Sequence, residues 1–111
     1  MALNLGTFTK LDDGVFTGTF RTLHVAAVLN IVPVDKSSEK APDYRVYTAQ
    51  RREVGAGWGQ KAKNSGADYI NLKIGAPEFG ANWVRCRLVK LEQPGEDGAD
   101  HIALWEPRDR S

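Results

Sequence analysis

Short segments in which apolar and polar residues alternate follow one another along most of this chain, and this pattern constrains the fold more than any other feature. In an extended strand successive side chains point to opposite faces, so such a segment buries one face and exposes the other. Residues 69–74 are a clear example, with Ile70, Leu72 and Ile74 on one face. No stretch has the period of an amphipathic helix. The sequence therefore predicts a fold built from strands.

Turn-forming residues separate the predicted strands and indicate an antiparallel arrangement. Asp13-Gly14 tolerates the positive backbone dihedral angles of a tight hairpin, and the polar segment 35–42 is expected to be a solvated loop. We predict an all-β fold of about six or seven strands, a small antiparallel barrel or a sandwich with little or no helix. The predicted strands cover residues 5–10, 15–23, 24–34, 44–49, 69–74, 83–91 and 101–105.

The chain length sets the expected number of domains. A chain of 111 residues is near the commonest size of a single domain and is too short to bury two cores. We expect one β domain over residues 1–111, with its core in residues 5–105, a loop at 76–82 and a frayed tail at 106–111.

A glycine-rich stretch in the middle of the chain, from Val54 to Gly59, is expected to form an exposed turn that presents Trp58. Its glycines have the G-x-G-x-G spacing, but Gln60 stands where a dinucleotide-binding loop needs its last glycine, and no helix follows. We therefore reject a nucleotide-binding loop. Two positions of Trp58 stay open: exposed at the turn, or folded back as a core plug whose indole N–H has a partner. Of these two we favour the plug.

The charges are distributed unevenly along a nearly neutral chain. The formal net charge is +1, yet residues 45–90 carry nine Lys and Arg against three acidic residues, a net of +6. Residues 1–44 have a net charge of −1 and residues 91–111 one of −4. The middle of the chain can therefore form a basic face on a protein that is not basic as a whole.

Cysteine content and the first residues bear on the expected location. Cys86 is the only cysteine, which excludes an intrachain disulfide and fits a reducing cytoplasm. The N-terminal residues lack a basic leader, and the apolar run 25–29 is too short to span a bilayer. We expect a cytoplasmic protein with no export signal and no membrane anchor.

Several sequence blocks, taken in order, resemble a known family. They are Leu5-Gly6-Thr7-Phe8-Thr9-Lys10, Phe16-Thr17-Gly18-Thr19-Phe20-Arg21-Thr22-Leu23, Pro33-Val34-Asp35-Lys36-Ser37-Ser38, Ala41-Pro42-Asp43-Tyr44-Arg45-Val46-Tyr47, Val54-Gly55-Ala56-Gly57-Trp58 and Asp68-Tyr69-Ile70-Asn71-Leu72-Lys73-Ile74. Over residues 5–105 the chain is similar to a small bacterial family, the domain of unknown function 736. Members often carry Lys-Lys directly after a Trp, whereas Gly59 and Gln60 stand between Trp58 and Lys61 here. The resemblance implies a setting on plasmids and other mobile genetic elements, and it implies no activity, cofactor or catalytic residue.

The basic and aromatic residues of the middle segment suggest the binding of single-stranded nucleic acid. A curved β surface stacks bases on aromatic rings while Lys and Arg follow the phosphates. The candidate stacking groups and phosphate contacts are Arg45, Tyr47, Arg51, Arg52, Trp58, Lys61, Tyr69 and Lys73. Trp83, Arg85 and Arg87 form a further outward group of the same kind. The competing interpretation is an ordinary solvated strand face, on which Tyr and Trp cover apolar surface and Arg stems pack beside them.

Catalytic and metal sites are not indicated by the sequence. His24 and His101 are far apart, Cys86 falls on an apolar face, and no Ser, Cys or carboxylate has a recognisable spacing to either His. The same residues make no metal-ligand set of familiar spacing. We expect a non-enzymatic binding or accessory protein that has no cofactor and no metal.

The alternative function is that of a protein-interaction module. An exposed edge strand, for which residues 44–49 are the candidate, would pair with a strand of another protein or of a second copy of this chain. Steep weakening of oligonucleotide binding by salt would favour nucleic-acid binding, and self-association in light scattering would favour the alternative.

Overall fold

The computed structural model of the chain describes residues 3–23, 26–63, 66–75, 83–93, 95 and 98–105. Over these residues the chain forms strands and turns and contains no helix, as the alternating pattern predicts. The eight strands are β1 (Leu3–Lys10), β2 (Phe16–Arg21), β3 (Ala26–Pro33), β4 (Tyr44–Thr48), β5 (Glu53–Lys61), β6 (Asp68–Ile74), β7 (Val84–Lys90) and β8 (His101–Trp105).

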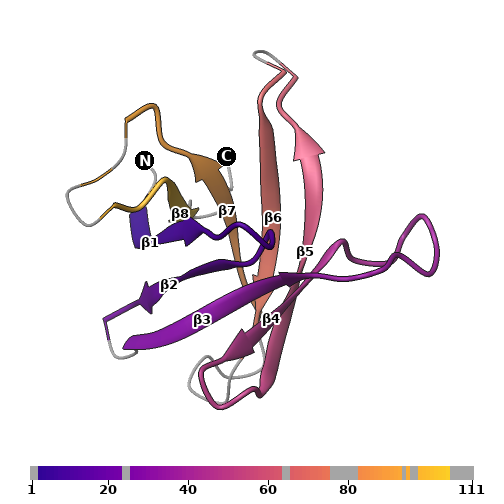
Figure 1. The fold of residues 1–111 in the computed structure, drawn as a ribbon, viewed down its shortest axis with the longest axis horizontal. Helices are drawn as coiled ribbons and strands as arrows, with labels where there is room; N and C mark the ends of the chain where they lie inside the picture. Colours follow the sequence, from indigo (N-terminus) through magenta and orange to yellow (C-terminus); the bar gives the residue numbers. More distant parts are fainter. Residues whose placement is uncertain are drawn as a thin grey trace, which may run out of the picture.

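The strands form a closed antiparallel barrel in which consecutive strands lie side by side (Figure 1). β1 pairs with β2 on one side and with β8 on the other, which joins the two ends of the sheet. In this closing pair Leu3 lies opposite Trp105, and Phe8 lies opposite His101. Closure gives hydrogen-bond partners to strands that would otherwise be edges. Of the two architectures left open by the sequence, the structure has the barrel.

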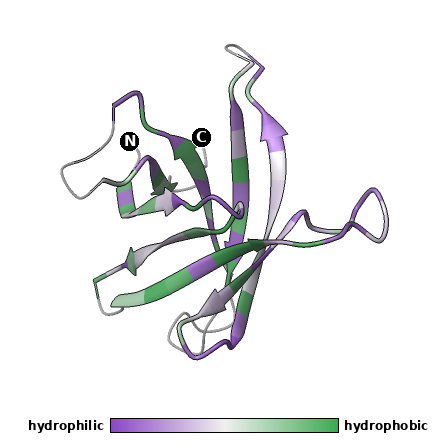
Figure 2. Ribbon diagram, in the orientation of Figure 1, coloured by the Kyte–Doolittle hydropathy of each residue, from purple (hydrophilic) through white to green (hydrophobic). Residues whose placement is uncertain are grey.

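The inward faces of the strands make one hydrophobic core. Phe8, Phe20, Ile31, Val46 and Leu88 are the largest of its fully buried side chains and are each at most 2% exposed. Figure 2 shows the cause, because hydrophobic and hydrophilic residues alternate along the strands. The core also contains Cys86, as predicted. The same alternation that predicts the strands thus decides which of their faces is buried.

The strand that the sequence analysis missed is β5, and the glycine-rich stretch belongs to it. The prediction of an exposed turn around Trp58 is therefore wrong, and the described residues form eight strands where about six or seven were expected. A Cβ atom at Gly55 would overlap the backbone oxygen of Lys73, and one at Gly57 would lie 2.8 Å from a methyl carbon of Ile70. β5 packs so closely on β6 that a Cβ atom at Gly55 would displace the backbone of β6, and one at Gly57 would displace the Ile70 side chain.

Two of the turns show how local residues set the hairpins. Gly14 has φ +88° in the β1–β2 turn and donates its N–H to the oxygen of Leu11 at 3.0 Å, as the Asp-Gly step predicts. In the β4–β5 turn the left-handed residue is Arg51, with φ 68°, and its N–H donates to the oxygen of Thr48 at 2.9 Å. Arg51 and Arg52 therefore lie at the end of the barrel where β4 turns into β5.

β4 is not an edge strand. Tyr44, Val46 and the residues between them pair with β3 on one side and with β5 on the other. The prediction that residues 44–49 offer a free edge is therefore wrong, because closure of the barrel uses both sides of this strand. His24, the predicted loop 76–82 and the predicted tail 106–111 lie outside the described residues. Among the residues that are described, no helix is long and apolar enough to cross a membrane.

Candidate functional site

The pairing register brings basic residues of three strands into one row on the outer surface of the barrel. Arg45 of β4 lies opposite Ala56 of β5, which lies opposite Lys73 of β6. Lys73 in turn lies opposite Arg85 of β7. Residues directly opposite on one face of a sheet have Cβ atoms about 5 Å apart. Lys73 and Arg85 are therefore immediate neighbours on the surface.

A second row runs beside the first. Trp58 of β5 lies opposite Asn71, and Asn71 lies opposite Arg87 of β7, which is followed across the sheet by Leu104. Tyr69 is two residues before Asn71 and points to the same outward side. The two rows make one continuous surface on neighbouring strands. We name it the β5–β7 outer face and define it by Trp58, Tyr69, Asn71, Lys73, Arg85 and Arg87.

A groove of about 520 Å³ lies on the β5–β7 outer face. Trp58, Lys73, Arg85 and Arg87 line it, and its described lining contains no acidic side chain. The Nζ atom of Lys73 also lies 5.1 Å from the centre of the Trp83 ring, which is 52% exposed. Positive charge therefore gathers around an open groove that is bordered by aromatic rings.

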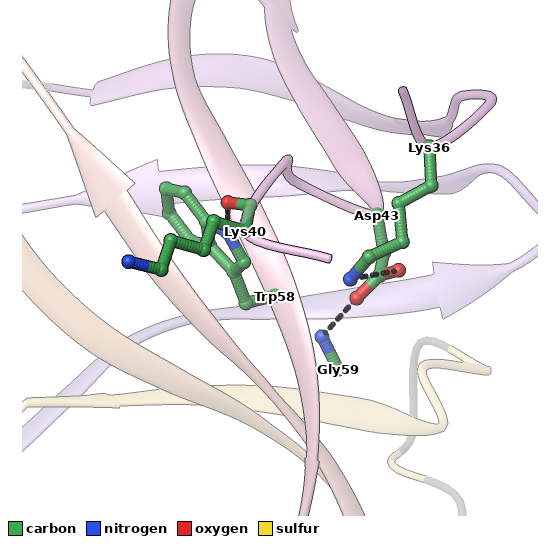
Figure 3. A network of polar contacts seen from close by, with 5 residues as sticks. All are labelled: Lys36, Lys40, Asp43, Trp58 and Gly59. Carbon is green, nitrogen blue, oxygen red and sulfur yellow. Dashed lines mark hydrogen bonds and ion pairs between the residues drawn. The ribbon is translucent and has the colours of Figure 1, made fainter. Parts of the chain in front are cut away.

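Trp58 is half-buried on this outer side of the sheet and is not part of the core cluster. Its indole N–H donates to the backbone oxygen of Lys40 at 3.1 Å (Figure 3). The indole thus has the partner that a buried Trp needs, but the partner belongs to the β3–β4 loop and not to the core. Neither a fully exposed ring nor a core plug describes this side chain.

Asp43 fixes the same loop to β5. Its Oδ2 atom accepts the N–H of Gly59 at 2.8 Å, and its Oδ1 atom lies 3.2 Å from Nζ of Lys36 (Figure 3). The N–H of Asp43 donates to the oxygen of Gly57 at 2.9 Å. The hydrogen bond from Gly59, and then the charge of Lys36, hold the pKa of this carboxyl below its ordinary value. The loop 34–43 is therefore held beside Trp58 by backbone and side-chain contacts.

The eight candidate nucleic-acid-binding residues predicted from the sequence fall into two groups in the structure. Trp58, Tyr69 and Lys73 belong to the β5–β7 outer face, and Arg45 stands at its border, where its guanidinium lies 3.3 Å from Glu53. The other four lie elsewhere: Tyr47, Arg51 and Arg52 are at the β4–β5 turn, and Lys61 is at the opposite end of β5.

The distance between these groups follows from the length of β5. This strand has nine residues, and a strand rises about 3.3 Å per residue, so its ends are roughly 26 Å apart. Tyr47 and Arg51 line a separate small hollow with Val15 and Asn30, on the side of the barrel formed by β2–β4. The eight residues therefore do not form one continuous site.

Three residues of the outer face stood outside the selected set: Asn71, Arg85 and Arg87. The sequence placed Arg85 and Arg87 on a surface of their own, because nothing local shows that β7 pairs with β6 through Lys73 and Asn71. The alternation in β7 was the available signal, and it identified the outward residues correctly. Register between strands is the missing information.

Other titratable groups do not form a metal or nucleophile site within the described part of the chain. No three His, Cys, Asp or Glu side chains among the described residues gather so that they would hold a metal ion. Burial raises the pKa of the Cys86 thiol to about 12. This thiol is therefore protonated and unreactive at neutral pH.

Comparison with known proteins gives a family and little more. A family model described as a protein of unknown function (DUF736) matches residues 4–108. The chain belongs to this family. The resemblance that the sequence blocks suggest is thus confirmed for the DUF736 chain, and the family description assigns no activity to it.

One curated protein is similar to the DUF736 chain. It is a proline–tRNA ligase of Corynebacterium diphtheriae, 27% identical over 104 residues. These residues are 94% of the DUF736 chain and 16% of the ligase, so the chain spans about a sixth of that relative. No solved structure matches the DUF736 chain.

Proposed function

We propose that this protein binds single-stranded nucleic acid through the β5–β7 outer face and that it is not an enzyme. The observation that carries the proposal is the groove that Lys73, Arg85 and Arg87 line together with Trp58, with no acidic side chain in the described lining. Cations of this kind neutralise phosphates, and aromatic rings stack on bases of any identity. Trp83 offers an exposed ring beside Lys73, at the border of the same surface.

A single strand suits this surface better than a duplex. Stacking on a protein ring needs bases whose faces are free, as they are in a single strand. Asn71 lies between Trp58 and Arg87 and supplies an amide that donates and accepts hydrogen bonds with a base edge. The lysine and arginine side chains on either side then contact the phosphate backbone of the nucleic acid.

The relative named as a proline–tRNA ligase points to the same class of partner, since its name places it among proteins that act on tRNA. The likeness covers 16% of that protein, so it supports a nucleic-acid partner and not a ligase activity. The same proposal includes two further points. The family resemblance suggests a setting on mobile genetic elements, and the single cysteine suggests a cytoplasmic location.

Fluorescence anisotropy with a labelled oligothymidylate at low salt tests the proposal. The double variant Arg85→Glu/Arg87→Glu should bind about tenfold more weakly or worse, because two phosphate contacts become repulsive. The control Arg21→Glu/Arg52→Glu makes the same change of charge elsewhere, on β2 across the barrel and at the β4–β5 turn. This control should bind like the wild-type protein.

Two results would refute the proposal. The first is a wild-type protein that does not bind the oligonucleotide at low salt. The second is an equal loss of affinity in both double variants, which would show that only the overall charge matters. Light scattering on the same samples tests the alternative, association with a second copy, which would have to use side-chain surfaces because β4 is paired on both sides.

A further inference from the structure

One end of the barrel is open and is lined by charged and aromatic side chains, in contrast to the hydrocarbon that fills the core. A cavity of about 740 Å³ lies there. Pockets of about 300–1,000 Å³ hold small-molecule ligands. We name this cavity the barrel mouth and define it by Lys10, Phe16, Tyr44, Lys61, Lys90 and His101.

The register shows why these residues meet. Lys90 lies opposite His101, and His101 lies opposite Phe8, which is 1% exposed and belongs to the core. Directly opposite residues share a face of the sheet, so Lys90 and His101 continue the inward face. Lys10 is two residues beyond Phe8 on the same face and lies opposite Phe16. The inward face thus changes from apolar to cationic where the core ends.

Aromatic rings form the inner wall of the barrel mouth. Phe16 is 4% exposed, and its ring meets the His101 ring edge to face at a centroid distance of 4.7 Å. The Tyr44 ring meets Phe16 in the same manner at 6.0 Å. Burial, followed by the charges of Asp43 and Asp68, raises the pKa of the Tyr44 phenol, so its hydroxyl is a neutral hydrogen-bond donor at physiological pH.

His101 is held in one orientation by Asp100. The Nδ1 atom of His101 lies 2.7 Å from Oδ1 of Asp100, and this oxygen also accepts the N–H of Lys10 at 3.0 Å. The hydrogen bond with His101 is the first cause of the lowered pKa of Asp100, so the carboxylate is ionised and can only accept. Nδ1 therefore carries the hydrogen, and Nε2 is the ring nitrogen left for a ligand.

The charges of the barrel mouth favour an anion. Asp100 is engaged by His101, and Asp68 lies 3.9 Å from Lys61. Lys10 and Lys90 have no carboxylate within ion-pair distance in the part of the chain that the structure describes, and Nζ of Lys10 stands 5.8 Å from the centre of the Phe16 ring. The ammonium group of Lys10 therefore stands over the aromatic wall, Lys90 lines the same cavity, and neither has a described carboxylate in ion-pair contact.

We propose that the barrel mouth binds a small organic anion that combines an aromatic ring with a carboxylate or phosphate group. The ring packs against Phe16, Tyr44 and the edge of His101, and the anionic group lies between the ammonium groups of Lys10 and Lys90. The inference goes beyond the proposed function, because this site is inside the end of the barrel and the nucleic-acid groove is on its outer side. Gln60 lines both cavities, so the two sites adjoin.

Backbone amide NMR titrations with four probes test this inference. Phenyl phosphate and benzoate carry a ring and an anion, benzyl alcohol carries a ring and an uncharged hydroxyl, and inorganic phosphate carries the anion alone. At least one of the first two should cause saturable shifts at Lys10, Phe16 and His101. Benzyl alcohol and inorganic phosphate should bind about tenfold more weakly or worse, because each lacks one half of the recognition. Comparison of phenyl phosphate with benzoate identifies the anionic group.

The variant Lys10→Gln/Lys90→Gln should weaken binding of the responsive probe by about tenfold or more. Both lysines are exposed, so the variant should fold, and its amide spectrum shows this directly. Tyr44→Phe removes only a hydroxyl, and as a second variant it should weaken binding of the probe less than Lys10→Gln/Lys90→Gln. The control Arg85→Gln/Arg87→Gln should bind the probe like the wild-type protein even if it loses all nucleic-acid binding.

Four outcomes would overturn the inference. Three of them are the absence of saturable shifts with both ring-bearing anions, binding of benzyl alcohol or inorganic phosphate as tight as theirs, and unchanged affinity in Lys10→Gln/Lys90→Gln. Loss of probe binding in Arg85→Gln/Arg87→Gln alone would also overturn it, since the probe would then occupy the outer groove. None of these results depends on whether an oligonucleotide binds.

Discussion

Removing cations from the β5–β7 outer face one at a time should flatten the salt dependence of nucleic-acid binding in equal steps. Lys73, Arg85 and Arg87 line the groove, and each phosphate contact with a single strand contributes about 0.7 log units of affinity per decade of salt. With three contacts, the wild-type affinity should fall by about 2 log units per decade. Lys73→Gln should reduce this slope to about 1.4, and Lys73→Gln/Arg85→Gln to about 0.7.

These slopes differ enough to be measured. Between about 50 mM and about 200 mM salt, they correspond to losses of affinity of about 18-fold, about 7-fold and about 3-fold in the three proteins. Glutamine keeps most of the aliphatic stem, so the change is mainly one of charge. Lys73 also contacts the Trp83 ring at 5.1 Å, so Arg85→Gln alone is needed as a check that has no such contact.

Anisotropy titrations of a labelled oligothymidylate over the salt series provide the slopes. Lys73→Gln and Arg85→Gln should give the same slope within error, and their double variant a lower one. Parallel lines for all four proteins would refute the reasoning, because they would show that these side chains do not meet phosphates. Arg52→Gln is the matched control, and its slope should equal that of the wild-type protein.

The remaining predictions concern stability. Trp58→Phe removes the indole donor to the Lys40 oxygen and should lower the free energy of unfolding by about 1 kcal/mol in urea titrations. Amide hydrogen exchange in the loop 34–43 should also become faster. Unchanged exchange there would show that this hydrogen bond does not hold the loop. Gly55→Ala should lower the free energy of unfolding by about 1–3 kcal/mol, because the added Cβ would overlap the Lys73 oxygen. At Gly59 the atom nearest to an added Cβ is Asp43 Oδ2 at 3.5 Å, so Gly59→Ala should be neutral or stabilising by up to about 1 kcal/mol. Equal effects of the two substitutions would contradict the placement of β5. Their hydrogen bonds hold the pKa values of Asp43 and Asp100 below that of an ordinary aspartate. The ionised forms therefore stabilise the fold above the unfolded-state pKa, and this contribution is lost as the pH falls through the folded-state values. The free energy of unfolding of the wild-type protein should therefore decrease at acidic pH, and that of Asp43→Asn/Asp100→Asn should decrease less. Identical pH profiles of the two proteins would show that these contacts do not contribute to stability.

Local alternation was sufficient to predict most of the barrel. Ile70, Leu72 and Ile74 are buried as their spacing predicts, and so is Cys86 on β7. The Asp-Gly step likewise predicted the β1–β2 turn. These features depend on residues close together in sequence, because the direction of a side chain in a strand is set by its immediate neighbours.

The glycines of β5 show where local reasoning ends. In isolation, Gly55 and Gly57 favour a turn, because glycine weakens a strand and permits unusual dihedral angles. Their role becomes clear only beside Lys73 and Ile70 of β6, which leave no room for a Cβ atom. The reason for these glycines is therefore a contact with another strand, and a single sequence does not show which strand that is.

The candidate site has the same limit. The sequence identified Lys73 and Trp58 as outward residues but did not show that Arg85 lies beside Lys73 or that Tyr47 lies far along the barrel from Lys61. Both facts follow from the pairing of β6 with β7 and of β4 with β5. Outward direction was thus predictable residue by residue, and membership of one surface was not.

The pairing of β1 with β8 has a consequence for how the protein folds during its synthesis. Leu3 meets Trp105, so the contact that completes the ring joins residues separated by almost the whole chain. Contacts of such long sequence separation form late and slow the search for the native state. During synthesis one flank of β1 stays unpaired until β8 has emerged. A chain truncated before β8 would have a sheet with two unpaired edges, on β1 and on β7, and both would be open to pairing with strands of other chains.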